Sequence, residues 1–175
     1  MDFDPGRSPV KILTSDLCDA HADAVVVDPV FTSFGGLDAF FGQIVTLKVF
    51  EDNAMVRAVL EEPGEGKVLV VDGGGSMRCA LVGGNLAQLA VSNGWRGIVV
   101  YGCIRDSNEI RGLSLGVKAL AAHPRKSRKG AHTGRRNLPL MFAGVSFRHA
   151  NWLYADSDGI VLSELPIHEG TSEVF

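Results

Sequence analysis

The amino-acid sequence predicts an α/β domain in which helices pack against a mixed β-sheet. Continuous apolar runs at Lys67–Val71 and Gly97–Tyr101 are typical of strands that are buried on both faces. Helical patterns separate such runs in the first two-thirds of the chain, and short β-type segments dominate the last third. This order of elements is typical of a layered α/β fold rather than an all-helical or all-β one.

Length and composition fit a single domain with its own core. A chain of 175 residues buries roughly 70% of its unfolded surface, so it needs neither a metal nor a disulfide to fold. Its 21 glycines make up 12% of the residues, against a usual share of about 7%. Ten of them lie between Gly73 and Gly116, and we therefore expect the chemistry in this window.

The N-terminal part begins with a predicted leader, residues 1–13, which opens with acids and has no apolar run typical of a signal peptide. The N-cap types Thr14, Ser15 and Asp16 then predict a short helix. Strands are predicted at Val25–Val27, Val30–Phe31 and Gln43–Phe50.

The middle of the chain alternates helices and strands. Asp52-Asn53 predicts the start of a helix that runs to about Glu62. Gly83-Gly84-Asn85 opens a second helix, which ends near Ser92. We expect the domain to span residues 14–165, with a fraying tail at 166–175. Further strands are predicted at Lys67–Val71, Cys79–Val82, Gly97–Tyr101, Val117–Ala121, Leu138–Phe142, Trp152–Tyr154 and Gly159–Leu162.

Charge is unevenly distributed along the chain. The formal net charge is −3, which excludes a global attraction to nucleic acid, and no RNP-type aromatic pattern occurs. We therefore expect no direct nucleic-acid partner. However, nine Lys or Arg residues and only two acids lie between Ile104 and Arg136. The densest part, Arg125–Arg136, is either a solvated loop or a docking patch for an acidic partner or RNA.

Cysteine usage and hydropathy indicate a cytoplasmic protein. The three cysteines are odd in number and form no Cys-x-x-Cys pair, which argues against a disulfide framework and a zinc site. No apolar run reaches the length of about 18 residues that a membrane span requires. We expect no membrane association.

The glycine-rich window does not match the nucleotide-binding loops. Counted from Gly73, the third glycine position of a dinucleotide fingerprint is Arg78, and counted from Gly74 the second is Ser76. Neither a P-loop nor a Gly-x-Ser-x-Gly elbow occurs. We interpret Gly73–Gly75, which follow Asp72, as a tight turn.

A second group of residues is better suited to bind a small anion. Gly83 and Gly84 stand at a predicted helix N-terminus, where free N–H groups and the helix dipole attract a carboxylate. Arg105-Asp106 follow a buried strand, at the sheet edge where α/β proteins bind ligands. Arginine grips a carboxylate or enolate oxygen, and aspartate is a hard ligand for Mg²⁺ or Mn²⁺. A tight turn and a structural ion pair are the alternative interpretations.

Five separated blocks of the sequence resemble one known family. They are TSDLCDA, FGGLDAFFGQIVTLKVFEDN, VLVVDGGGSMRCALVGGNLAQLAVSNGWRGIVVYGCIRD, LGVKALAAHPRKS and WLYADSDGIVLSE, and they extend from about Thr14 to Glu164 in the family's order. The chain resembles the regulator of ribonuclease E activity A (RraA) family, which is related to the class II pyruvate aldolases that act on 4-hydroxy-4-methyl-2-oxoglutarate (HMG).

The resemblance implies a fold, an assembly and an activity. It implies a swivelling β/β/α-type domain that assembles as a ring-shaped homotrimer or a larger hexameric ring. It also implies a divalent-metal-dependent HMG aldolase and oxaloacetate decarboxylase that acts on small 2-oxo acids through a pyruvate enolate. The alternative is a non-catalytic inhibitor that binds a ribonuclease E-type enzyme or an RNA helicase. A methyltransferase label used in this family has no support, because no methyl-donor loop is present.

The resemblance also assigns roles to individual residues. Amides of Gly83, Gly84, Asn85 and Leu86 would hold the carboxylate of the 2-oxo acid. Arg105 would contact its C2 oxygen, and Asp106 would bind the metal. Asp19 would lie near the place where the aldolases position an acid from a neighbouring subunit.

One position departs from the aldolase pattern. The aldolases carry an Asp that is separated by twenty residues from the Arg-Asp pair, and this chain has Gly84 there. We therefore expect weaker lyase activity, with Glu109 as a partial substitute for the missing acid.

Overall fold

The computed structural model describes residues 12–128, 130 and 133–168. It contains a mixed sheet whose strand order is β1-β12-β11-β3-β4-β6-β7-β2, with β5 added beside β6 and β8 beside β3. The helices are α1 (Thr14–Ala20), α2 (Ala54–Leu60), α3 (Gly84–Ser92) and α4 (Ser107–Arg111). The strands are β1 (Val25–Val26), β2 (Thr32–Ser33), β3 (Phe40–Lys48), β4 (Val68–Asp72), β5 (Ala80–Val82), β6 (Gly97–Ile104), β7 (Gly116–Ala122), β8 (Arg135–Arg136), β9 (Leu140–Phe142), β10 (Val145–Phe147), β11 (Trp152–Ala155) and β12 (Ile160–Ser163).

Parallel strands form the centre of the sheet. β3, β4, β6 and β7 are parallel neighbours, whereas β11, β12, β1 and β2 are added antiparallel. The predicted mixed sheet is therefore confirmed. Because α2 and α3 connect parallel strands, the carboxyl ends of the four central strands lie at one edge of the sheet.

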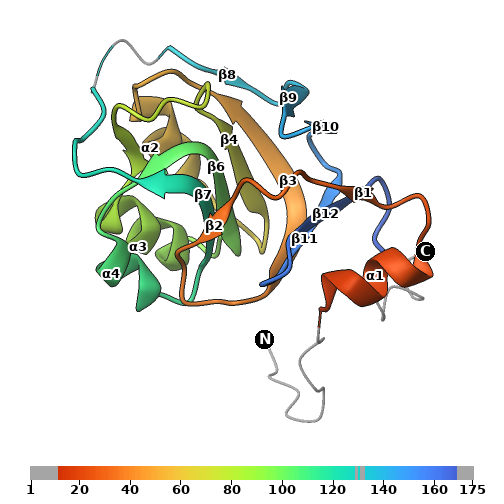
Figure 1. Ribbon diagram of the computed structural model, residues 1–175. Coiled ribbons are helices and arrows are strands. Elements are labelled where there is room, and N and C mark those ends of the chain that lie inside the picture. The colour runs from red at the N-terminus through yellow and green to blue at the C-terminus, as the bar shows by residue number, and fades with distance from the viewer. Residues whose placement is uncertain (1–11, 129, 131–132, 169–175) are drawn as a thin grey trace.

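Side chains alternate between two cores on the two faces of the sheet. Leu69 and Val71 of β4 pack with the apolar residues of α2, α3 and α4. Val68 and Val70 of the same strand pack on the other face, against the β9–β10 hairpin and β11. Figure 1 shows α2, α3 and α4 together on one side of the sheet, with α1 apart from them. The two cores explain why the Lys67–Val71 run is apolar throughout.

Residues from both ends of the described chain form a third, smaller cluster. Ile12, Tyr154 and Val161 are buried together, and Ile167 packs against them. The hydroxyl of Tyr154 also accepts the backbone N–H of Ile167 at 2.8 Å. Ile12 and Ile167 thus pack against the domain, and the rest of the predicted leader and tail, residues 1–11 and 169–175, lies outside the described residues.

The first helix begins one residue earlier than its capping residues predict. Leu13 is the N-cap of α1, and its own side chain makes no capping hydrogen bond. Thr14 is buried instead: its backbone N–H and its hydroxyl each donate to the Asp156 carboxylate at 2.7 Å. The Asp156 backbone carbonyl accepts the ammonium of buried Lys118 at 2.6 Å. This network attaches α1 to the β11–β12 turn and to β7.

Most other predicted elements form with shifted ends. A strand predicted at Val30–Phe31 forms instead at Thr32–Ser33, where it pairs with β7. The helix α4 and the strands β8 and β10 were not predicted. No helix in the described part of the chain is long and apolar enough to cross a membrane.

Candidate functional site

The candidate site lies at the carboxyl edge of the central parallel strands. Arg105 and Asp106 follow β6 directly, and Gly83 follows β5, which runs parallel to β6. The backbone N–H of Arg105 donates to the carbonyl of Val82 at 2.9 Å, so the two strand ends are held side by side. This is the sheet edge where α/β proteins bind their ligands.

The Asp106 carboxylate reaches across to the start of α3. Its Oδ2 accepts the backbone N–H of Gly84 at 3.0 Å, and the Nε of Arg105 lies 3.8 Å from the same oxygen. A Cβ on Gly83 would approach this oxygen to 2.8 Å, so glycine allows the close approach. The fold thus brings Gly83, Gly84, Arg105 and Asp106 together at one edge of the sheet.

Asp106 has an unusual backbone conformation. Its φ of 57° and ψ of 41° lie in the left-handed region, which aspartate tolerates better than most residues. It is the N-cap residue of α4, but its side chain makes no capping hydrogen bond to that helix. The left-handed conformation of Asp106 directs its side chain toward Gly84 instead, and the carboxylate accepts a hydrogen bond from that first-turn amide of α3.

Glu109 returns to the same place one helical turn later. A Cβ built on Gly84 would overlap the Glu109 carboxylate, so this group occupies the space that a side chain at position 84 would need. Two carboxylates therefore meet at Gly84. The helix that positions Glu109 was missed, although Asp106-Ser107-Asn108-Glu109 has the spacing of a capping box, which could have indicated it.

The first turn of α3 offers further N–H donors. The amide of Ala87 donates to the Gly83 carbonyl at 3.0 Å, which closes the first turn. The amides of Asn85 and Leu86 precede it and have no acceptor within the helix. The Gly84 amide is different, because Asp106 already accepts its hydrogen bond.

The site is open to solvent. The Arg105 and Asp106 side chains are 40% and 44% exposed, and Glu109 is exposed as well. Within the described residues, no group of three or more His, Cys, Asp or Glu side chains could hold a metal ion. Protein ligands for a cation at this site would therefore be limited to Asp106 and Glu109, with solvent or substrate completing its coordination.

Two other candidate acids, Asp19 and Asp72, lie elsewhere in the fold. Asp19 is exposed on α1, which Figure 1 places at the opposite end of the molecule from α3 and α4. Asp72 accepts the amide of Gly74 at 2.8 Å, and Gly74 and Gly75 both have a φ of 68°. The predicted tight turn after Asp72 is confirmed.

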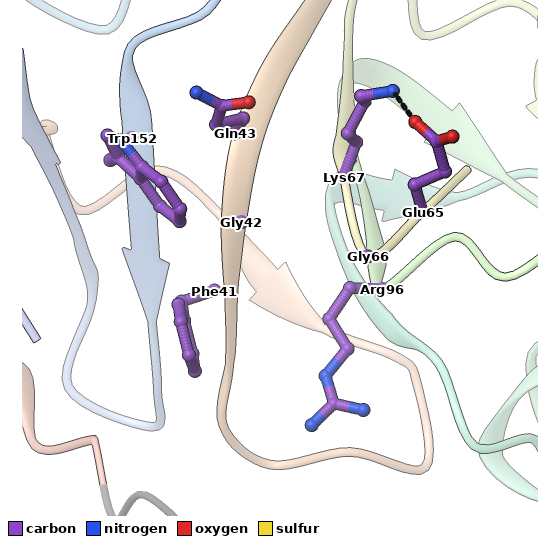
Figure 2. A pocket seen from close by; sticks show the side chains of 8 residues that line it. All are labelled: Phe41, Gly42, Gln43, Glu65, Gly66, Lys67, Arg96 and Trp152. Carbon is purple, nitrogen blue, oxygen red and sulfur yellow. Dashed lines mark hydrogen bonds and ion pairs between the residues drawn. The ribbon is translucent and has the colours of Figure 1, made fainter. Parts of the chain in front are cut away.

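A separate hollow of about 400 Å³ lies at the amino ends of the central strands. Figure 2 shows its aromatic wall, Phe41 and Trp152, opposite Lys67 and Arg96. The ammonium of Lys67 forms an ion pair with Glu65. Arg96 is the second cationic residue that lines the hollow. Because Lys67 and Arg96 directly precede β4 and β6, this hollow lies at the other edge of the sheet from Arg105.

Comparisons with known proteins agree with the geometry. The family model "RraA-like: Aldolase/RraA" matches residues 14–162. A protein of Laribacter hongkongensis named "Putative 4-hydroxy-4-methyl-2-oxoglutarate aldolase" is 59% identical over 90% of this chain and 99% of its own. One of Alkalilimnicola ehrlichii with the same name is 56% identical over 88% of this chain and 96% of its own.

A solved structure has the same fold. The "RNA-processing inhibitor RraA from Thermus thermophilis" superposes with a TM-score of 0.87 at 48% identity, over 93% of this chain and 98% of that one. The match of the family model and the identity to these relatives lead to one conclusion: the chain is a member of the RraA-like (Aldolase/RraA) family.

Proposed function

We propose that this protein is a divalent-metal-dependent carbon–carbon lyase that acts on small 2-oxo acids through a pyruvate enolate. HMG and oxaloacetate are the substrates proposed. The observation that carries this proposal is the meeting of Arg105, Asp106 and Glu109 at the glycine start of α3. The aldolase names of relatives that are 59% and 56% identical support the same reaction.

The start of α3 is the proposed binding place for the substrate carboxylate. The amides of Asn85 and Leu86 point toward the positive end of the helix dipole, where a carboxylate is stabilised. Gly83 leaves room for the substrate to approach the backbone. The Gly84 amide joins these donors when Asp106 releases it.

Asp106 and Glu109 are suited to a hard divalent cation. Both supply carboxylate oxygens, the ligand type of Mg²⁺ and Mn²⁺, and Mg²⁺ is commonly held by only one or two carboxylates and several waters. Asp106 would hold the ion through its carboxylate, and the Glu109 carboxylate would lie nearby. The bound cation would supply a Lewis acid next to the C2 oxygen of the substrate.

Arg105 would stabilise the charge that develops on the substrate. In HMG the 4-hydroxyl loses its proton, the C3–C4 bond breaks, and its electron pair moves onto C3 and the C2 oxygen. This step releases one pyruvate and leaves the enolate of a second. In oxaloacetate the same bond breaks with loss of carbon dioxide. In both, a guanidinium beside the C2 oxygen lowers the barrier by stabilising the enolate.

Glu109 would transfer the protons. The reaction needs a base for the 4-hydroxyl and an acid that later delivers a proton to C3, and one carboxylate can do both. The Glu109 carboxylate occupies the space beside Gly84, and it is free for this role because Asp106 would hold the metal ion. We further propose that a ring trimer covers the open site and that Asp19 of a neighbouring subunit lies near it.

The assay is pyruvate release, coupled to lactate dehydrogenase, from HMG and from oxaloacetate with Mg²⁺ or Mn²⁺. We expect turnover that stops with EDTA and falls at least 100-fold in Asp106→Ala and Arg105→Ala. Asp38→Ala, at an exposed loop position before β3, is the matched control and should keep full activity. Turnover that is unchanged by EDTA and by both site substitutions would contradict the proposal.

A non-catalytic regulator is the second candidate function. It is favoured by the 48% identity to a protein described as an RNA-processing inhibitor. Cleavage of a short RNA by a ribonuclease E-type enzyme should then slow when the protein is added, and Asp106→Ala should inhibit as well as the wild type. Unchanged cleavage at a large excess of protein would argue against this function.

A further inference from the structure

A strongly basic pocket lies at the same edge of the sheet but outside the candidate site. It has a volume of about 260 Å³. We call it the basic pocket and define it by its lining residues, Glu51, Arg78, Cys79, Arg125, Lys126 and Arg128. They come from the segments after β3, before β5 and after β7.

Cations dominate the charge of this pocket. It contains four cationic side chains and one acid, Glu51. Glu51 is already engaged, because Arg78 lies 2.6 Å from its carboxylate and the Ser76 hydroxyl donates to it at 2.7 Å. Among the residues that the structure describes, no carboxylate lies within ion-pair distance of Arg125, Lys126 or Arg128. The pocket therefore carries about three uncompensated positive charges.

The backbone that carries these cations is fixed. Arg125 and Ser127 bond to Ala80 on β5, at 2.8 and 3.1 Å, and the Arg128 amide donates to the Glu51 carbonyl at 2.9 Å. Ser127 is buried, whereas Lys126 and Arg128 on either side are exposed. This alternation is typical of a strand at the edge of a sheet, and it directs both cations toward solvent. An anion would therefore bind to a surface whose backbone is already ordered.

An exposed aromatic ring stands at the rim of the basic pocket. Phe50 is 58% exposed, and the Arg78 guanidinium lies 5.7 Å from its ring centroid. The ring rests against Gly74, where a Cβ would come within 2.9 Å of it. Because Gly74 also has a positive φ, glycine is favoured there on two grounds. The ring is therefore supported from below while more than half of the side chain stays accessible.

We propose that the basic pocket binds single-stranded nucleic acid. Arg125, Lys126 and Arg128 would contact successive phosphates, and a base would stack at Phe50 beside Arg78. A groove of cations with an adjacent aromatic ring is how proteins bind single strands without reading their sequence. An acidic peptide would use the cations but not the ring. The proposal is independent of the lyase chemistry, because none of these residues belongs to the candidate site.

This proposal departs from the expectation, based on net charge, that the chain has no direct nucleic-acid partner. A net charge of −3 averages over the whole chain, whereas a strand of nucleic acid meets only the local field. Because the proposed contacts join cations to phosphates, binding should weaken at high salt, and it should be confined to this pocket, where the cations are concentrated.

The test is fluorescence anisotropy of a labelled 15-nucleotide oligouridine, titrated with the full chain at several salt concentrations. We expect binding whose affinity falls with salt, with a log–log slope of about −2 for three phosphate contacts. Arg128→Glu should weaken binding at least ten-fold and make the slope shallower. Phe50→Ala should weaken it about ten-fold with the slope unchanged.

Arg96→Glu is the matched control, because it reverses one exposed cation at the opposite edge of the sheet. It should bind like the wild type, and all variants should retain the wild-type circular dichroism and pyruvate release. Oligothymidine of the same length shows whether the sugar matters, and polyglutamate shows whether charge alone suffices. The proposal is overturned by absence of binding at low salt, by equal loss in Arg96→Glu, or by polyglutamate binding as tightly as oligouridine.

Discussion

The carboxylate of Glu109 fills the space into which a side chain at Gly84 would project. The aldolase pattern that this chain resembles has an Asp at position 84. The two arrangements differ in the helix that would carry the acid, α3 or α4, but a side chain at position 84 would begin where the Glu109 carboxylate lies. We therefore infer that Glu109 replaces the missing acid.

Neutralising Glu109 should reduce turnover without disturbing the fold. In Glu109→Gln the side chain keeps its shape but can no longer accept and return a proton, so kcat for pyruvate release should fall by about 100-fold or more. Glu61→Gln, an exposed position at the end of α2, should leave kcat unchanged. Equal kcat values for the wild type and Glu109→Gln would remove Glu109 from the mechanism.

Substitutions at Gly84 should separate activity from stability. Ala has the higher helix propensity and φ is not positive here, so Gly84→Ala should leave the Tm unchanged or slightly raised. The new methyl group displaces the flexible end of Glu109, so kcat should fall. Gly84→Asp supplies a carboxylate from α3 and should be more active than Gly84→Ala.

The corresponding double variant completes this comparison. Gly84→Asp combined with Glu109→Ala should be more active than Glu109→Ala alone, since one acid then replaces the other. Steady-state kinetics on the wild type, Gly84→Asp, Glu109→Ala and the double variant measures the coupling between the two positions. Strictly additive losses would show that the two positions do not share one function.

Arg105 should be replaceable by lysine only in part. Lysine keeps the positive charge but lacks the planar fork of N–H donors, so Arg105→Lys should lower kcat by about ten- to 100-fold, with a smaller change in KM. The reason is that the enolate charge develops after substrate has bound. A change confined to KM would instead indicate that Arg105 only binds the ground state.

Asp156 should make stability depend on pH. Burial raises its pKa, but hydrogen bonds from Thr14, Asp158 and Gly159 outweigh burial and leave the pKa below the usual value. A carboxyl whose folded pKa is lowered stabilises the protein above its unfolded pKa, about 3.9, and this contribution is lost as pH falls through the folded value.

Asp156→Asn should therefore lower the free energy of unfolding at pH 7 by about 1–3 kcal/mol, because buried donors lose a charged acceptor. The difference from the wild type should shrink below about pH 4. Urea unfolding at pH 7 and pH 3.5 measures both values. Asp158→Asn, an exposed neighbour, should change little at either pH; a constant deficit in Asp156→Asn across this range would contradict the pKa direction.

Local patterns predicted the sheet well because its strands are buried on both faces. The runs at β4 and β6 appear in the sequence as continuous apolar segments. The start of α1 could not be predicted in the same way. Thr14 is a residue type that often occurs as an N-cap, but its hydroxyl donates to Asp156, which lies 142 positions away in the sequence. Such a contact outweighs local capping preference and is not visible in a short window of sequence.

The candidate site was predictable as a set of residues but not as a geometry. Arg105 and Asp106 follow an obvious strand, and Gly83 precedes an obvious helix, so their shared edge could be expected. The place of Glu109 could not, because it depends on the left-handed turn at Asp106. Likewise, Phe50 and Arg78 became part of a surface only when the fold placed their loops together.

The central claim, that this chain stabilises a pyruvate enolate at Asp106 and Arg105, is tested most directly by proton exchange. The methyl protons of pyruvate in D₂O exchange through the enolate, and proton NMR follows their loss without knowledge of the physiological substrate. We predict exchange that requires Mg²⁺, stops with EDTA and is lost in Asp106→Ala. No exchange above the protein-free rate with the wild type, or equal exchange in Asp106→Ala, would contradict the account.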